Sequence, residues 1–239
     1  NTGTVSFLEN SGFAIGTVNT VGLTTTGNTT LSSAGAVTQS QKVAASGLEL
    51  LGSGTFTLTN TGAANAITTL AANAGVVSFT QGTAFTVGTV NTVGITTTGN
   101  LALVGSAGMT IGANISTGAG TQTYTGPITL STGAIALAST DAAIIFSGST
   151  TTINGARDLT INSGSARITF GGTVGQSTAI SSLTLQGVGE NFLPSAITAT
   201  GNITGGNLNT AGSLSVTGNA NIGNVGASLF VGNLSGTGN

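Results

Sequence analysis

The sequence contains a near-copy of part of itself. Residues 5–31 match residues 77–103 at 17 of 27 positions, at a constant offset of 72. Near the end of the chain the tripeptide Thr-Gly-Asn recurs at offsets of 17 and 20. Such repeats are typical of solenoids, in which each coil of the backbone stacks on the one before it. The shorter period indicates coils of about 20 residues, and the longer repeat then spans several coils.

Short runs in which apolar and hydroxyl residues alternate fill the chain between glycines. In residues 55–59, Phe56 and Leu58 lie on one side of an extended strand and three threonines lie on the other. The same alternation occurs in residues 128–130, 135–137, 159–161, 183–185 and 214–216. The chain is rich in Gly, Thr, Ser, Asn and Val, which are weak helix formers, and it has no apolar stripe of helical period. We therefore predict an all-β protein.

A parallel β-solenoid explains both features, whereas an antiparallel sandwich gives no reason for a 72-residue near-copy. Inward apolar residues of each coil would lie on the like residues of the next coil, and outward Thr, Ser and Asn would form ladders. At about 20 residues per coil, we expect one continuous solenoid over residues 1–239 with roughly 12 coils, in which residues 196–239 carry the shorter repeats. The expected core includes Phe56, Leu58, Phe79, Phe146, Ile161, Phe170, Leu183 and Leu185.

Charged residues are very scarce. The chain has 3 Lys and Arg, 5 Asp and Glu, no His and no Cys. Three cations cannot build the basic patch that nucleic acid requires, and the missing His and Cys remove the commonest ligands of zinc and iron. No apolar run approaches the roughly 18 residues of a membrane span. We expect no cofactor, no metal, no nucleic-acid partner and no membrane insertion.

Catalysis would have to use the few acidic residues. Asp141 and Asp158 are close enough in sequence for one coil to stack them, with Arg157 and Arg167 nearby, in the manner of a polysaccharide-cleaving carboxylate pair. Enzymes of that kind gather several charged groups in one groove. We instead expect all the acids to be solvated surface charges and the protein not to be an enzyme; they are Glu9, Glu49, Asp141, Asp158 and Glu190.

Binding surfaces must be built from polar side chains, because the chain has no Trp and a single tyrosine, Tyr124, and its Phe residues are expected in the core. Outward threonines are the best candidates for a regular surface. An ice-binding array is one alternative, although these threonines fall at irregular offsets and Thr is also a good strand former. The candidate outward ladder is Thr55, Thr57, Thr59, Thr96, Thr98, Thr121, Thr123 and Thr125.

A further signal lies in seven stretches of the chain, Gly35–Gln39, Leu48–Asn60, Thr68–Asn73, Val87–Asn91, Gln122–Leu130, Ala156–Asn162 and Thr169–Gly175. These stretches resemble the rod repeats of filamentous-haemagglutinin-like exoproteins, which are large adhesins of Gram-negative bacteria exported by two-partner secretion. The resemblance covers about residues 35–190 and, through the duplication, residues 5–35.

The resemblance implies a right-handed parallel β-helix that leaves the cell through a partner pore and acts in adhesion, aggregation or biofilm. The Asn-Pro motif typical of that family's secretion domain does not occur here, so we expect this chain to be part of the rod and not the export signal. We also expect it to be a mature or excised segment. Expected partners are further copies of the rod, or a host surface, neighbouring cell or matrix polysaccharide, all outside the cell. Residues 196–239 also resemble repeats of phage tail fibres, which makes a tail-fibre shaft the main alternative.

Overall fold

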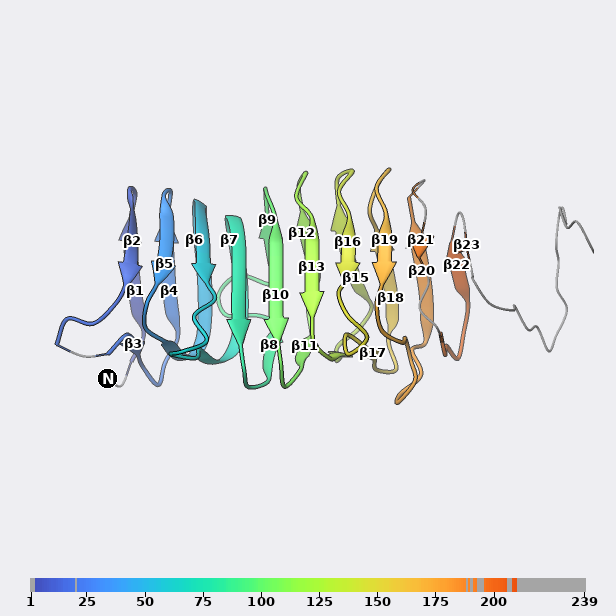
Figure 1. The fold of residues 1–239 in the computed structure, drawn as a ribbon, viewed down its shortest axis with the longest axis horizontal. Coiled ribbons are helices and arrows are strands. Elements are labelled where there is room, and N and C mark those ends of the chain that lie inside the picture. Colours follow the sequence, from blue (N-terminus) through green and yellow to red (C-terminus); the bar gives the residue numbers. More distant parts are fainter. Residues whose placement is uncertain are drawn as a thin grey trace, which may run out of the picture. The chain divides into compact units, whose positions relative to one another are not determined.

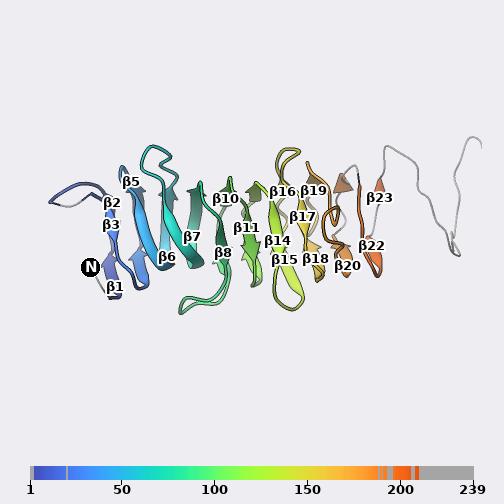
Figure 2. The ribbon, with the colours of Figure 1, turned by 90° about the horizontal axis from the view of Figure 1, so that it is seen from below.

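The computed structural model describes residues 3–19, 21–187, 189, 191–192, 196–205 and 208–209. Its regular secondary structure in this part is all β-strand, and the strands of successive turns pair in parallel. The chain winds over three parallel sheets, here named faces A, B and C, and passes from C to B to A in each turn. Figures 1 and 2 show the strands of successive turns following one another along the axis.

Each face collects one strand segment from every turn. Two long strands, β6 (Val43–Leu58) and β7 (Ala66–Gln81), pass through all three faces. Face A comprises β2 (Gly12–Ile15), β5 (Ala36–Gln39), residues 55–58 of β6, residues 76–81 of β7, β10 (Leu101–Gly105), β13 (Gln122–Thr125), β16 (Ile144–Phe146), β19 (Ile168–Phe170), β21 (Asn191–Phe192) and β23 (Leu208–Asn209).

Faces B and C are built in the same way. Face B comprises β1 (Val5–Glu9), β4 (Thr29–Ser33), residues 48–51 of β6, residues 71–74 of β7, β9 (Ile95–Thr97), β12 (Ile115–Thr117), β15 (Ile135–Ser139), β18 (Asp158–Asn162), β20 (Ser182–Gln186) and β22 (Ile203–Gly205). Face C comprises β3 (Leu23–Thr24), residues 43–45 of β6, residues 66–70 of β7, β8 (Phe85–Val87), β11 (Met109–Ile111), β14 (Ile128–Leu130), β17 (Ile153–Asn154) and bridges at Val174 and Ile197.

The average turn is longer than the sequence predicted. Along face B, nine strand pairings lead from Phe7 to Gly205, so the average turn has about 22 residues. Turns on this face differ in length: the step from Val5 to Thr29 is longer than the step from Thr29 to Leu48. The described residues make about nine turns, and the 12 coils predicted for residues 1–239 are not confirmed. The compact unit ends at Asn209, and the expected continuation through residues 210–239 lies outside the described residues.

The 72-residue duplication does not equal a whole number of turns. Val5 lies on face B, whereas its repeat partner Val77 lies on face A. The repeat thus advances the chain by three turns and one further face. Equivalent segments of the two copies consequently occupy neighbouring faces of the solenoid.

Columns of stacked apolar side chains fill the interior. One column on face A runs through six turns, and its members are Leu58, Phe79, Leu103, Tyr124, Phe146 and Phe170. The last three form a ring stack, with centroids 5.2 Å apart for Tyr124 and Phe146 and 5.0 Å apart for Phe146 and Phe170. All eight residues expected in the core are buried, with Phe170 the most exposed at 6%.

The corner between faces B and A is a column of glycines, one from each of five successive turns: Gly35, Gly54, Gly75, Gly99 and Gly120. A Cβ on Gly120 would lie 2.0 Å from the backbone carbon of Gly99, and a Cβ on Gly54 would lie 2.1 Å from the carbonyl oxygen of Gly35. The turns can therefore stack at the spacing of about 4.8 Å between strands only because these corners carry no side chain.

One buried hydroxyl in the core lacks a partner. The Oγ1 atom of Thr29 makes no hydrogen bond, and its residue is fully buried. At the equivalent position of the second copy the chain has Leu101. We expect Thr29→Val to raise the free energy of unfolding by about 1 kcal/mol, because it removes an unsatisfied polar group without changing the side chain's shape. Urea denaturation measures this change.

Thr117 provides the matched control for that substitution. It is also buried, but its Oγ1 donates a 2.7 Å hydrogen bond to the carbonyl oxygen of Gly120. Thr117→Val should therefore lower the free energy of unfolding, by about 1 kcal/mol. A loss of stability from both substitutions would show that the Thr29 hydroxyl finds a partner after all.

Candidate functional site

The eight threonines of the predicted ladder all point outward, but they do not form one ladder. Thr55, Thr57, Thr59, Thr96 and Thr98 are exposed, and Thr121, Thr123 and Thr125 are half-buried. Thr57 and Thr123 share a column of face A, but Ser78 and Ala102 lie between them. Thr96 lies on face B, between Asn73 and Ser116. Register places the strand members of this candidate ladder on two faces, so they do not form one continuous row.

Other threonines do stack on successive turns. On face C, Thr69, Thr86, Thr110 and Thr129 are register partners in four consecutive turns. On face B, Thr160, Thr184 and Thr204 are partners in three consecutive turns. Each ladder repeats one hydroxyl and one methyl group at the strand spacing of about 4.8 Å. The sequence did not indicate these ladders, since the sequence separation between partners changes from turn to turn.

The two aspartates considered for catalysis lie at opposite ends of face B. Asp158 begins β18 and accepts a 2.6 Å hydrogen bond from the hydroxyl of Ser182. Asp141 follows β15 and accepts a 2.8 Å bond from the backbone nitrogen of Ser165, in the corner that follows β18. That backbone hydrogen bond lowers the pKa of Asp141 from its usual 3.8. Each carboxylate thus accepts a hydrogen bond from the following turn, and the two aspartates do not form a catalytic pair.

Glu49 is not a solvated surface charge. It points outward from face B, yet it is only 3% exposed. Its Oε1 accepts hydrogen bonds from the backbone nitrogen of Thr92 at 2.8 Å and from the hydroxyl of Thr92 at 2.6 Å. Its Oε2 accepts from the amide of Asn91 and from the hydroxyl of Thr30, both at 2.8 Å. The prediction of a solvated acid fails here, because the loop of residues 88–94 covers the carboxylate.

This loop connects β8 to β9 and folds back across face B toward the N-terminal end (Figure 2). It covers Ala71, which points outward but is fully buried, and it reaches Glu49 two turns before β9. Val90 packs against the Cα of Gly47, where a Cβ would lie 3.0 Å from both valine methyl groups. A glycine and a glutamate two residues later therefore form the seat on which the loop lies.

The seat predicts acid-dependent release of the loop. Burial raises the pKa of Glu49, but hydrogen bonds from Thr92, Asn91 and Thr30 outweigh burial and hold the pKa below its usual 4.5. The stabilisation is therefore present above pH 4.5 and is lost as the pH falls through the lowered pKa. We expect hydrogen exchange of the Thr92 amide, corrected for its intrinsic rate, to accelerate between pH 6 and about pH 3.

The control for this prediction is Glu49→Gln. The variant should show faster exchange in residues 88–94 already at pH 6, because a neutral amide is a weaker acceptor and brings a competing donor. Its remaining pH dependence should be small. An equal acid response in the wild type and in the variant would assign the effect to another group.

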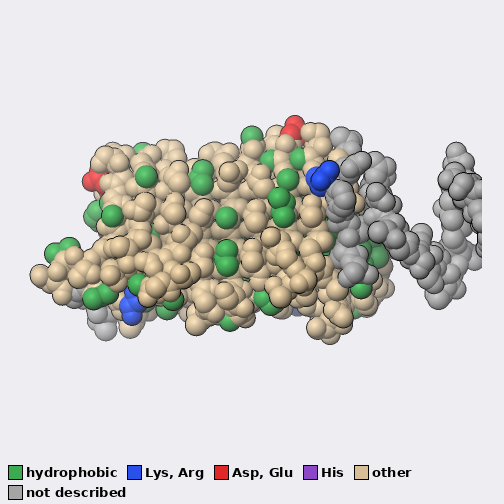
Figure 3. Space-filling view, in the orientation of Figure 1, with side chains coloured by type: hydrophobic (Ala, Val, Ile, Leu, Met, Phe, Trp, Pro, Cys, Tyr) green, Lys and Arg blue, Asp and Glu red, His purple; other side chains and the backbone are tan. Residues whose placement is uncertain are grey.

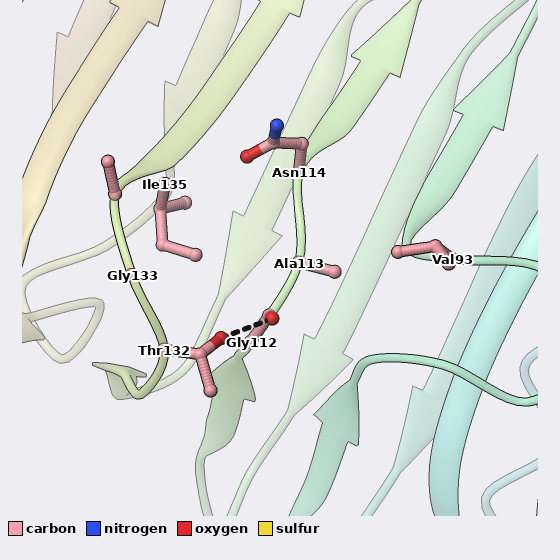
Figure 4. A pocket seen from close by; sticks show the side chains of 8 residues that line it. Val93, Gly112, Ala113, Asn114, Thr132, Gly133 and Ile135 are labelled. Atoms are coloured by element: carbon pink, nitrogen blue, oxygen red, sulfur yellow. Dashed lines mark hydrogen bonds between the residues drawn. The ribbon is translucent and has the colours of Figure 1, made fainter.

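An open groove of about 420 Å³ lies beside the same loop, at the corner between faces C and B (Figure 4). It is lined by Val93, Gly112, Ala113, Asn114, Thr132, Gly133, Ala134 and Ile135. The hydroxyl of Thr132 donates to the carbonyl oxygen of Gly112. The lining contains no titratable side chain, so the groove offers small apolar contacts and amide or hydroxyl hydrogen bonds, but no acid or base.

Charged side chains are scattered over the surface. Figure 3 shows the few acidic and basic groups as separate spots that do not gather into a charged patch on the face drawn. Among the described residues, no group of three or more His, Cys, Asp or Glu side chains is placed to hold a metal ion. Nor do these residues form a helix long and apolar enough to cross a membrane. Tyr124, the single tyrosine, is fully buried and donates to the side-chain oxygen of Gln122, so it offers no aromatic platform.

Comparison with protein-family models, with curated proteins and with solved structures gave no significant match.

Proposed function

We propose that this chain is a structural segment of a secreted bacterial surface filament or adhesin, and that its solenoid is right-handed. The observation that carries the proposal is the repetitive surface: small, mostly uncharged side chains point outward on successive turns, with threonine ladders of four turns on face C and three turns on face B, and buried columns lie beneath them. A rod of this kind gains length by adding turns and keeps one surface throughout. The resemblance to filamentous-haemagglutinin-like rods supports export, adhesion and a place outside the cell.

Electron microscopy of the purified chain at several concentrations tests the proposal. The nine described turns account for about 43 Å of rod at the strand spacing of about 4.8 Å. We expect thin rods at low concentration and longer filaments of the same width at high concentration, with right-handed coils in a reconstruction. Globular particles would contradict the proposal. A trimer in analytical ultracentrifugation would instead favour the phage tail-fibre shaft.

A display experiment tests the adhesive role. The chain is fused to an outer-membrane anchor in a bacterium that does not aggregate, and settling and attachment to surfaces are measured against the anchor alone. Increased settling or attachment is expected, since the surface carries few charges to repel another cell. Unchanged settling and attachment would reduce the role to that of a passive stalk.

The threonine ladder of face C favours one second candidate, an ice-binding surface. Thr69, Thr86, Thr110 and Thr129 form a single row of hydroxyl and methyl groups with one repeat distance. If this row orders water, the chain should show thermal hysteresis, and Thr110→Lys in the middle of the row should abolish it. Thr57→Lys on face A is the control. Absence of hysteresis in the wild type rejects this candidate.

A further inference from the structure

The two copies of the 72-residue repeat carry the same loop. Residues 16–22 and 88–94 both read Gly-Thr-Val-Asn-Thr-Val-Gly. Each loop is closed by a hydrogen bond from its last backbone nitrogen to the carbonyl oxygen of its first residue, 3.1 Å long in the first loop and 2.8 Å in the second. The last glycines, Gly22 and Gly94, have φ angles of 71° and 70°. Identical sequences have thus closed into loops in the same way at two places along the solenoid.

Only the second loop has a seat within the described residues. The loop of residues 88–94 extends toward the N-terminal end and donates hydrogen bonds to Glu49, which lies two turns earlier. Between β2 and β3 in the first turn, residues 16–19 and 21–22 of the first loop extend past the N-terminal strands (Figures 1 and 2). Val18 is 92% exposed, whereas its counterpart Val90 packs on Gly47. No described carboxylate lies against Asn19, the counterpart of Asn91.

An aromatic pair shows the same contrast. Phe79 and Phe85 meet edge to face with centroids 5.2 Å apart, and both are buried. Their counterparts Phe7 and Phe13 meet edge to face at 4.6 Å, but Phe7 is 44% exposed. Within the described residues, a preceding turn covers the second pair and none covers the first. Apolar surface and loop donors are therefore exposed together at one edge.

We infer that this N-terminal edge, formed by β1, β2, β3 and the described residues 16–19 and 21–22 of the loop between β2 and β3, is a docking surface for further turns of a parallel β-solenoid whose outer face carries a glutamate two residues after a glycine. The amide of Asn19 binds the glutamate, and Val18 packs on the glycine. Both contacts have their counterparts at the seat, where the amide of Asn91 binds Glu49 and Val90 packs on Gly47. The inference does not depend on the proposed role outside the cell.

The occupant follows from the chemistry of the edge. β1 pairs only with β4 among the described strands, so its other side presents backbone groups that a parallel strand satisfies. Phe7 points inward like its register partner Leu31, and together with Phe13 it needs an apolar layer of the kind that the interior columns supply. A free acidic peptide would satisfy Asn19 but would leave these side chains exposed. A solenoid turn covers both.

The test extends the full chain. A second copy of residues 5–76 is joined before Val5, so that residues 5–31 follow the added copy as residues 77–103 follow the original one. Hydrogen exchange of residues 16–22 is compared in the natural chain, the extended chain and the extended chain with Glu49→Gln in the added copy only. We expect the exchange rate of these residues to fall roughly tenfold in the extended chain. In the variant, the rate should rise again to nearly its value in the natural chain.

Residues 88–94 provide an internal control. Glu49→Gln at the original position should accelerate exchange in residues 88–94 and leave residues 16–22 unchanged. The inference is overturned if residues 16–22 exchange equally fast in the natural and extended chains, or if the added glutamine has no effect. It is also overturned if the added copy exchanges like an unfolded chain, since the edge then does not accept such a turn. None of these outcomes bears on secretion or adhesion.

Discussion

Gly120→Ala should destabilise the solenoid by about 3 kcal/mol or more, because no flexible atom can yield to the new methyl group. The Cβ would lie 2.0 Å from the backbone carbon of Gly99, 2.1 Å from its carbonyl oxygen and 2.5 Å from the backbone nitrogen of Asn100. Relief requires the two turns to separate at this corner, which breaks strand pairing on either side. Urea denaturation of the wild type and the variant measures the change.

Gly82→Ala is the matched control. Gly82 also lacks a positive φ angle, and a Cβ there would meet nothing within 4 Å. The substitution should be neutral or stabilise by less than about 1 kcal/mol, because alanine restricts the unfolded chain. If both alanine variants were equally stable, the turns would not be stacked through a glycine corner.

Phe146→Ala should cost about 3 to 5 kcal/mol, the usual range for deleting a buried aromatic ring. Phe146 is 1% exposed and lies between Tyr124 and Phe170, with interplanar angles of 15° and 10°. Its loss leaves a cavity in the middle of the column and removes both ring contacts. Because each turn contacts only its neighbours, exchange protection should fall most in β13 and β19.

Ile145→Ala serves as the control for that cavity. Ile145 is the neighbouring residue in β16, but it points outward and is half-buried, between Thr123 and Thr169. Its truncation should cost about 1 kcal/mol or less. Comparable losses from the two variants would mean that the inside and the outside of this strand are not as described.

The inward and outward sides of the strands were readable from the sequence because they depend on a local period of two. Phe56 and Leu58 are fully buried and Thr55 and Thr57 are exposed, as their alternation indicates. The same local pattern predicts a sheet in any context. The choice of a parallel solenoid needed the 72-residue repeat as well.

The number of turns was not readable, because corners differ in length. The corner between β8 and β9 spans residues 88–94, whereas the same corner one turn later, between β11 and β12, spans only residues 112–114. Extra corner residues lengthen the chain without adding a turn. A period taken from the tail repeats therefore underestimates the length of the average turn.

The threonine ladders and the contacts of Glu49 depend on long-range register. The threonine ladders depend on which residues meet across turns of unequal length, and no local pattern shows this. Glu49 sits in an ordinary strand sequence, and its partners Asn91 and Thr92 come 42 and 43 residues later. The one available signal was the exact repetition of Gly-Thr-Val-Asn-Thr-Val-Gly, which a featureless corner does not require.

Disulfide trapping tests the three-faced parallel stacking most directly, because the natural chain has no cysteine. Thr110 and Thr129 are register partners on face C, and strands about 4.8 Å apart lie within the Cα separation that a disulfide accepts. Thr96 is nearer to Thr110 in sequence but lies on face B. Under mild oxidation, Thr110→Cys with Thr129→Cys should cross-link quantitatively, and Thr96→Cys with Thr110→Cys should not. Preferred cross-linking of the second pair, or none in the first, would contradict the solenoid.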